Sequence, residues 1–247
     1  MTGKFLCDAI SDVKDDYVLE AGQLRSNKKQ AGKRKHLWKP LLVAALIPVL
    51  MITAYAADFL NIQSLVSGAE HFRSSNYQDI GKAMKKAGFQ IDAVEQFESG
   101  YAFQNLAVQD TRGLDENGKE VLKYREIQLG YQNAAGNRVH LTAEPVLEEI
   151  TVSETPVAQS RGIAGVTVDY RLSHYKFVPA DYQLTEADKL WQQQPGNYIS
   201  YGSDQVEQHD IASLNWEKDG VRYLLMDTDA VATPEVLFSM AAELIRG

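Results

Sequence analysis

The chain has 247 residues and a formal net charge of -8, and the charge is unevenly distributed. Residues 58–247 carry 16 basic and 28 acidic side chains, and a net charge of -12 repels a phosphate backbone, so this part is not expected to bind nucleic acid. The single cysteine, Cys7, cannot form an intrachain disulfide, but about 190 residues bury enough apolar surface to fold without one.

Residues 1–39 have the composition of a short cytoplasmic arm. Apolar side chains recur at roughly helical spacing and acidic residues fill the other face, which predicts a short amphipathic helix. Such a helix is marginal alone and gains stability by docking on a partner; the alternative is a solvated tail that only sets topology. The candidate partner-binding residues are Phe5, Leu6, Ile10, Val13 and Tyr17.

Residues 40–57 contain no charged side chain and predict one transmembrane helix. Eighteen helical residues span about 27 Å, close to the thickness of the hydrocarbon core. Trp38 and Tyr55 lie near the two ends, where amphipathic rings favour the membrane interface, and Pro48 in the middle removes one backbone hydrogen bond. The seven basic residues in 21–39 place the N-terminus in the cytoplasm and would contact anionic membrane lipid.

Two alternatives to a membrane anchor remain open for this segment. It could be a buried core helix, although the adjoining basic block is more typical of a membrane flank. It could also belong to a signal peptide, because Ala54-Tyr55-Ala56 has the small-x-small form of a cleavage site, with cleavage after Ala56.

Residues 58–75 are expected to form a connector, and residues 76–247 a folded extracytoplasmic domain. Asn76 can cap a helix over 77–87 that ends at Gly88. Alternating apolar and polar residues then predict strands at 89–94, 100–108, 121–131, 138–142 and 165–178, with turns at 115–118 and 134–137. The stretch 144–159 is either an edge strand or a loop, and 184–193 is either a short helix capped by Thr185 or a loop.

The last elements are a hairpin and a helix. Lys218-Asp219-Gly220 predicts the hairpin turn and makes Trp216 and Tyr223 cross-strand neighbours. Thr233, followed by a proline, is a typical helix start. The pattern predicts an α+β fold, in which a curved antiparallel sheet is packed with helices at both ends of the domain.

The sequence offers little for catalysis. His71, His140, His174 and His209 are scattered and form no metal-binding or catalytic motif. Asp227 and Asp229 could chelate calcium, but a turn between hairpin and helix is the simpler interpretation. We therefore expect no enzyme, no metal and no cofactor. The aromatic residues of the strands indicate packed sheet faces, with a ligand cleft as the alternative.

Two parts of the sequence resemble known families. The run from Leu6 to Ala21, followed by a basic block and one span, resembles membrane-bound regulators of Gram-positive Firmicutes, many of the anti-sigma-factor type. The zinc-binding cluster of some anti-sigma domains is lacking. Residues 160–247, including 215–223 and Thr233, resemble an extracytoplasmic domain of unknown function whose relatives look like the half-barrel of lipoprotein carriers.

The resemblances imply a single-pass cell-membrane protein that acts in signalling. The arm would bind a cytoplasmic protein partner, with a sigma factor as the first candidate, while the outer domain would sense an envelope condition or bind a hydrophobic ligand. The alternative is an extracytoplasmic lipid- or lipoprotein-binding module with a purely topogenic arm.

Overall fold

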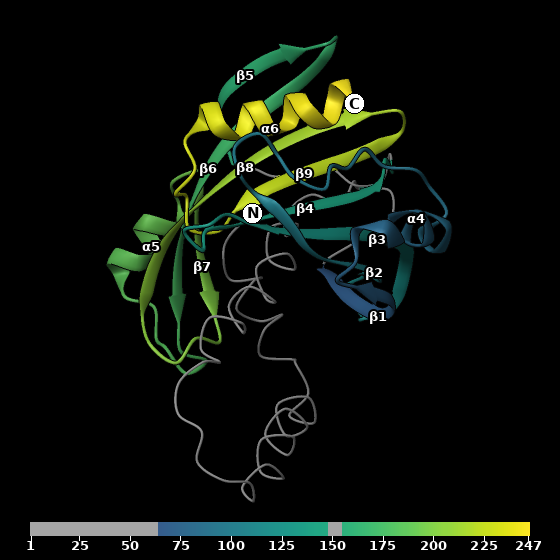
Figure 1. Cartoon of the computed structure of the whole chain (residues 1–247). Helices are drawn as coiled ribbons and strands as arrows, with labels where there is room; N and C mark the ends of the chain where they lie inside the picture. Colours follow the sequence, from purple (N-terminus) through teal and green to yellow (C-terminus); the bar gives the residue numbers. More distant parts are fainter. Residues whose placement is uncertain (1–63, 148–154) are drawn as a thin grey trace, which may run out of the picture. The chain divides into compact units, whose positions relative to one another are not determined.

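The computed structural model describes residues 64–147 and 155–247, which form a nine-stranded sheet with three α-helices (Figure 1). This confirms the predicted α+β class. The strands are β1 (Ser64–Ser74), β2 (Ala102–Leu114), β3 (Glu120–Gln132), β4 (Arg138–Pro145), β5 (Val157–Ile163), β6 (Val166–Val178), β7 (Asn197–Tyr201), β8 (Glu207–Lys218) and β9 (Val221–Asp227). The helices are the 3-10 turn η1 (Tyr77–Asp79), α4 (Ile80–Ala87), α5 (Glu186–Gln192) and α6 (Pro234–Arg246).

The strand order is β1-β2-β3-β4-β9-β8-β6-β5, and β7 pairs with β6 beside this path. The pairs along the path are antiparallel, but β6 and β7 are parallel, so the sheet is mixed and the prediction of a wholly antiparallel sheet is wrong. The β8–β9 hairpin joins the first half of the sheet by pairing β9 with β4. This junction places residues near 144 beside residues near 222.

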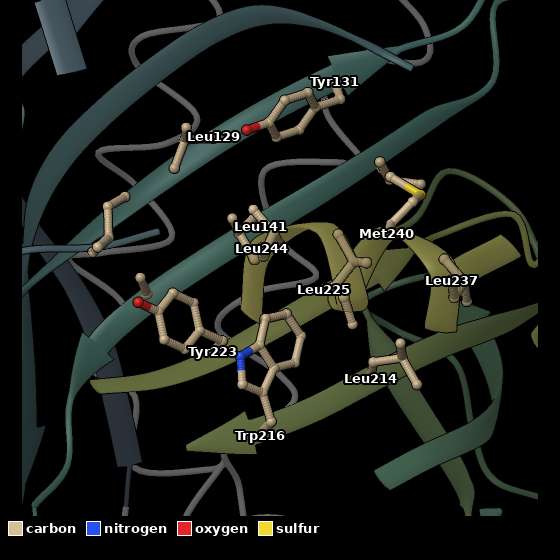
Figure 2. Packing of buried hydrophobic residues seen from close by; sticks show 14 of the residues in the cluster. Leu129, Tyr131, Leu141, Leu214, Trp216, Tyr223, Leu225, Leu237, Met240 and Leu244 are labelled. Carbon is tan, nitrogen blue, oxygen red and sulfur yellow. The ribbon is translucent and has the colours of Figure 1, made fainter. Parts of the chain in front are cut away.

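One face of the sheet, the helix-covered face, packs against α4, α6 and the segment 88–101. Alternate residues of β2, β3, β4, β8 and β9 point into this core together with α6. Figure 2 shows Leu237 and Met240 of α6 near Leu214 and Leu225 of the sheet. These core residues lie between Phe72 and Ile245 of the described part of the chain.

The ends of the helices follow the local sequence. Asn76 accepts a hydrogen bond from Gln78 N, as expected for a cap, but the first turn is the 3-10 turn η1. Gly88, in the left-handed region with φ 93°, ends α4. Thr185 and Asp188 form a capping box at the start of α5, which resolves 184–193 as a helix. Thr233 accepts from Val236 N at the start of α6.

Two predicted segments differ from the structure. Residues 64–74, expected within the connector 58–75, form the edge strand β1, so the sheet begins before the predicted domain boundary at residue 76. Residues 89–94, expected as a strand, are irregular. Their backbone groups bond to tyrosine hydroxyls in place of a neighbouring strand: Tyr77 donates to Ala93 O, Tyr131 donates to Val94 O, and Tyr223 accepts from Asp92 N.

The part of the chain described here contains no helix that is long and apolar enough to cross a membrane. The predicted transmembrane segment 40–57 and the arm 1–39 lie outside the described residues. The membrane anchor and its orientation therefore stay predictions.

Candidate ligand-binding face

The sheet face turned away from α4 and α6, here called the opposite face, carries a row of polar residues across five strands. Gln109 of β2 is registered with Glu126 of β3, Glu144 of β4 with Arg222 of β9, and Arg222 with Glu217 of β8. Ile127 of β3 is registered with Ala143 of β4; Glu126 precedes Ile127 and Glu144 follows Ala143, so the antiparallel register continues to the two glutamates. Two glutamates thus stand opposite each other on neighbouring strands, an arrangement that is unfavourable for like charges.

Both glutamates are buried, at 5% exposure for Glu126 and 8% for Glu144. Glu126 Oε1 accepts hydrogen bonds from Gln109 Nε2 at 2.5 Å and from Gln128 Nε2 at 2.7 Å. Glu144 Oε1 accepts a long hydrogen bond of 3.5 Å from Arg222 Nη1. Arg222 directs its Nε at Glu217 Oε1, 3.0 Å away, so its charge is shared between two carboxylates.

This environment disfavours the ionised form of Glu144. Burial, followed by the charge of Glu126, raises the pKa of Glu144 to about 7, against the lowering influence of Tyr124 and Arg222. The described groups of this row comprise three carboxylates and one guanidinium, so they do not neutralise one another.

Tyr124 of β3 lies beside these carboxylates and is 7% exposed. Its hydroxyl interacts with the carboxyl of Glu144. Burial raises the pKa of Tyr124 strongly, and the nearby charges of Glu144 and Glu126 raise it further.

An apolar cluster continues the opposite face along β6, β7, β8 and β9. It consists of the buried residues Tyr175, Phe177, Ile211 and Met226, with Tyr198 and Leu224 packed against them. The rings of Tyr175 and Tyr198 stack with centroids 5.1 Å apart, and Tyr175 stacks on Phe177 at 5.6 Å. Arg222, Leu224 and Met226 alternate along β9, so the acidic row and the apolar cluster adjoin on one surface.

Where the described chain resumes after residue 154, it lies on the opposite face. The hydroxyl of Thr155 is hydrogen-bonded to Ser173 Oγ at 3.0 Å and to Tyr198 Oη at 2.7 Å. Both partners belong to β6 and β7 of this face. The face is therefore bordered at the apolar end by a loop that is tied to it through hydroxyl groups.

The structure separates the histidines that sequence analysis considered. His71 is 2.7 Å from Asp110 of β2, His174 is 2.6 Å from Asp210, and His209 is 3.2 Å from Glu207. His140 is half-buried on β4, and burial lowers its pKa. Within the described ranges, no three His, Cys, Asp or Glu side chains gather in a way that could hold a metal ion.

Asp227 has a structural role in the turn before α6. Its carboxylate accepts hydrogen bonds from Asp229 N at 3.1 Å and from Ala232 N at 2.6 Å. These contacts fit the interpretation of residues 227–229 as a turn rather than as a calcium loop.

The partner-binding candidates of the arm and the membrane residues Trp38, Pro48 and Tyr55 lie outside the described residues. The aromatic residues of the strands divide between the two faces: Trp216 and Tyr223 stack in the helix-covered core, whereas Tyr175, Phe177 and Tyr198 line the opposite face. The acidic row was missed by sequence analysis. The alternation of Tyr124, Glu126 and Gln128 gives them one face, but only the strand order brings Glu144 and Arg222 to them.

Comparisons of the chain with protein-family models, with curated proteins and with solved structures found no match.

Proposed function

We propose that this protein is a single-pass signalling regulator of the cell membrane, without catalytic activity, whose extracytoplasmic domain binds an envelope ligand on the opposite face of its sheet. The observation that carries the ligand-binding part is the buried pair Glu126 and Glu144 with the buried Tyr124 beside it, on a face that continues into an apolar cluster. Ligand sites combine apolar walls with a few convergent polar groups. Perturbed titratable groups also concentrate at such sites.

A neutral hydrophobic dye tests this part directly. Residues 60–247 include all described strands and the described core, so a fragment of these residues is expected to bind Nile red with an increase in fluorescence. Leu224→Gln, between the acidic row and the apolar cluster, should weaken binding about tenfold, whereas Leu190→Gln, at a residue of α5 that is 65% exposed, should not. Equal binding by both variants, with circular dichroism showing folded protein, would contradict a ligand site on this face.

The membrane topology is supported by the uncharged stretch 40–57 behind a basic block. Because Cys7 is the only cysteine, it reports the side of the arm. In intact cells a membrane-impermeant maleimide should leave Cys7 unlabelled, and it should label a cysteine placed at Asn117, in the β2–β3 turn, in a Cys7→Ser background. Labelling of Cys7 in intact cells would reverse the orientation, and a shortened mature protein would show cleavage.

The signalling part rests on the apolar stripe of the arm and on the resemblance to anti-sigma regulators. Residues 1–39 are expected to capture a cytoplasmic partner, with a sigma factor as the first candidate. Ile10→Asp should abolish capture, because it puts a charge on the stripe, while Ser11→Asp adds the same charge on the other side of the helix. Loss of capture in both variants would indicate binding by charge alone rather than by the stripe.

A second candidate function is an envelope module that binds lipid or lipoprotein, with an arm that only sets topology. The apolar cluster of the opposite face favours it as much as it favours the regulator. Capture by the arm distinguishes the two functions. If residues 1–39 recover no specific partner while the domain binds Nile red through Leu224, the protein is a binding module and not a regulator.

A further inference from the structure

We infer that a basic patch at one end of the domain docks on the anionic lipid headgroups of the membrane that anchors the chain. The patch lies on the helix-covered face, beside the core, and consists of Lys85, Lys86, Arg112, Lys123 and Arg125. This inference rests on the single-pass topology proposed above and adds the surface with which the domain meets the membrane.

The register of β2 and β3 gathers three of the cations. Arg112 is registered with Lys123, and Arg125 follows two residues later on β3. Both strands continue the alternation of the core pair Val108 and Ile127, so the three side chains share the helix-covered face. Like charges directly opposite each other in a sheet are unfavourable, and a nearby anionic surface relieves this repulsion.

Helix α4 adds two lysines to the patch. It packs against β2 and β3 (Figure 1), and Arg125 Nη1 donates a hydrogen bond to Lys86 O at 2.6 Å. Lys85 and Lys86 are exposed and lie in the last turn of this helix. The end of α4 therefore extends the basic surface of the two strands.

Carboxylates hold the patch together without neutralising it. Asp110 is 3% exposed and lies 2.9 Å from Lys123 Nζ and 3.5 Å from Arg125 Nε. Glu120 Oε2 lies 4.0 Å from Arg112 Nη1, at the limit of an ion pair. Five cations against these two carboxylates leave an excess of positive charge, while residues 58–247 as a whole are acidic. An anionic membrane thus attracts this patch and repels the remainder of the domain.

The point at which the chain enters the domain puts the patch near the membrane. The strand β1 begins with Ser64, registered with Leu114, and Val66 is registered with Arg112. The predicted span ends at residue 57, so seven residue steps, at most about 25 Å, separate it from Ser64. Arg112 lies two residues along β2 from the entry point, which keeps the patch within reach of the headgroups.

The test uses the full chain reconstituted into vesicles, with a fluorophore on a single cysteine in the Cys7→Ser background. Gln90→Cys places the fluorophore two residues after the end of α4. Ala135→Cys places it in the β3–β4 turn, about 30 Å along β3 from Lys123. A nitroxide quencher on the lipid headgroups reports how close each fluorophore lies to the membrane surface.

Anionic lipid should bring the patch to the surface. With about one third phosphatidylglycerol, quenching at Gln90 should be at least about twofold stronger than in pure phosphatidylcholine, and quenching at Ala135 should not change. Lys85→Gln combined with Lys86→Gln should abolish this difference, because each lysine near an anionic surface contributes about fivefold to the docking equilibrium. Arg138→Gln combined with Lys189→Gln removes the same charge at exposed positions outside the patch and should keep the difference.

The outcomes separate this inference from the proposed topology. Protein that leaves the vesicles on alkaline extraction would contradict the membrane anchor and the inference with it. If the protein stays in the membrane but quenching at Gln90 is equal in both lipids, or falls alike in the two double variants, the anchor stands and docking by the patch is wrong. Loss of the difference on adding inorganic phosphate at constant ionic strength would assign the patch to a soluble anion and overturn lipid docking as well.

Discussion

Trp216 and Tyr223 stack across the β8–β9 hairpin with ring centroids 5.1 Å apart and planes 3° from parallel. Tyr223 also bonds outside the hairpin, because its hydroxyl accepts a hydrogen bond from Asp92 N at 3.0 Å. The pair therefore joins the hairpin to the irregular segment 88–101, which covers part of the same core. Sequence analysis predicted the pairing from the turn, whereas the contact with Asp92, 131 residues earlier in the chain, has no local signal.

Tyr223→Phe keeps the stacked ring and removes this hydrogen bond. The partly buried Asp92 N–H then loses its acceptor, so the free energy of unfolding should fall by about 1–2 kcal/mol in urea denaturation. Tyr170→Phe is the control, since the Tyr170 ring packs on Phe238 in the same core and should lose a few tenths of that amount. Equal losses in the two variants would show that the hydroxyl of Tyr223 does not anchor the segment.

The elements that sequence predicted well are those specified by adjacent residues. The β8–β9 turn has Asp219 at φ 52° and Gly220 at φ 75°, the positive values for which an Asp-Gly pair is suited. Thr185 and Thr233 cap α5 and α6 through hydrogen bonds that span three residues. Such contacts can be predicted because both partners stand in the same short stretch of sequence.

The elements that sequence missed depend on distant partners. The strand β1 is defined by its pairing with β2, which has two register irregularities around Glu70, and its own sequence did not predict it. The parallel pairing of β7 with β6 has no signature in its five residues. The acidic row likewise depends on the registers of β4 with β9 and of β3 with β4, so each glutamate looked like an ordinary surface residue.

The candidate site makes a prediction about pH and stability. The carboxyl of Glu144 has a pKa of about 7 in the fold and about 4.3 in the unfolded chain. Because the folded value is the higher one, Glu144 costs no stability below about pH 4, costs more as pH rises from 4 to 7, and has its full cost above pH 7.

Glu144→Gln should therefore raise the free energy of unfolding by about 1–3 kcal/mol at pH 8 and change it little at pH 4. Thermal unfolding of the wild type and the variant across this range measures the difference. Glu116→Gln, at an exposed turn position, should show no such pH dependence. A Glu144→Gln variant that is less stable at pH 8 than at pH 4, relative to wild type, would mean that Arg222 compensates the buried charge fully.

Asp188 has the opposite dependence on pH. Lys176 donates a hydrogen bond to its carboxylate, as do Thr185 N at 2.9 Å and the hydroxyls of Thr185 and Tyr182. These donors, Lys176 first, hold the pKa of Asp188 well below its usual range. The stabilisation is present above the unfolded pKa of about 3.9 and is lost as pH falls towards the lower folded value.

Asp188→Asn should lower the free energy of unfolding by about 1–3 kcal/mol at pH 7, because it leaves the half-buried Lys176 ammonium without a counter-charge. The difference from wild type should shrink as pH falls below 4, which urea titrations at several pH values can follow. Glu186→Gln is the control, since Glu186 pairs with Lys189 on the exposed side of the same helix. A pH-independent loss in Asp188→Asn would assign the effect to the capping box alone.

Lys218 joins the β8–β9 turn to the end of α6. Its Nζ donates to Asp92 Oδ2 at 2.8 Å and to Ile245 O at 3.0 Å, where the helix exposes its last carbonyl groups and its dipole favours a cation. Lys218→Met should keep the packing of the side-chain stem and cost about 1–2 kcal/mol in the free energy of unfolding. Lys82→Met removes an ion pair with Asp79 at a lysine that is 71% exposed and should cost at most about 0.5 kcal/mol.

Because Ile245 is near the end of α6, hydrogen exchange of the last helical turn should speed up in Lys218→Met and not in Lys82→Met. Unchanged exchange in that turn would mean that the helix is held by the burial of Leu244 and Ile245 without the lysine.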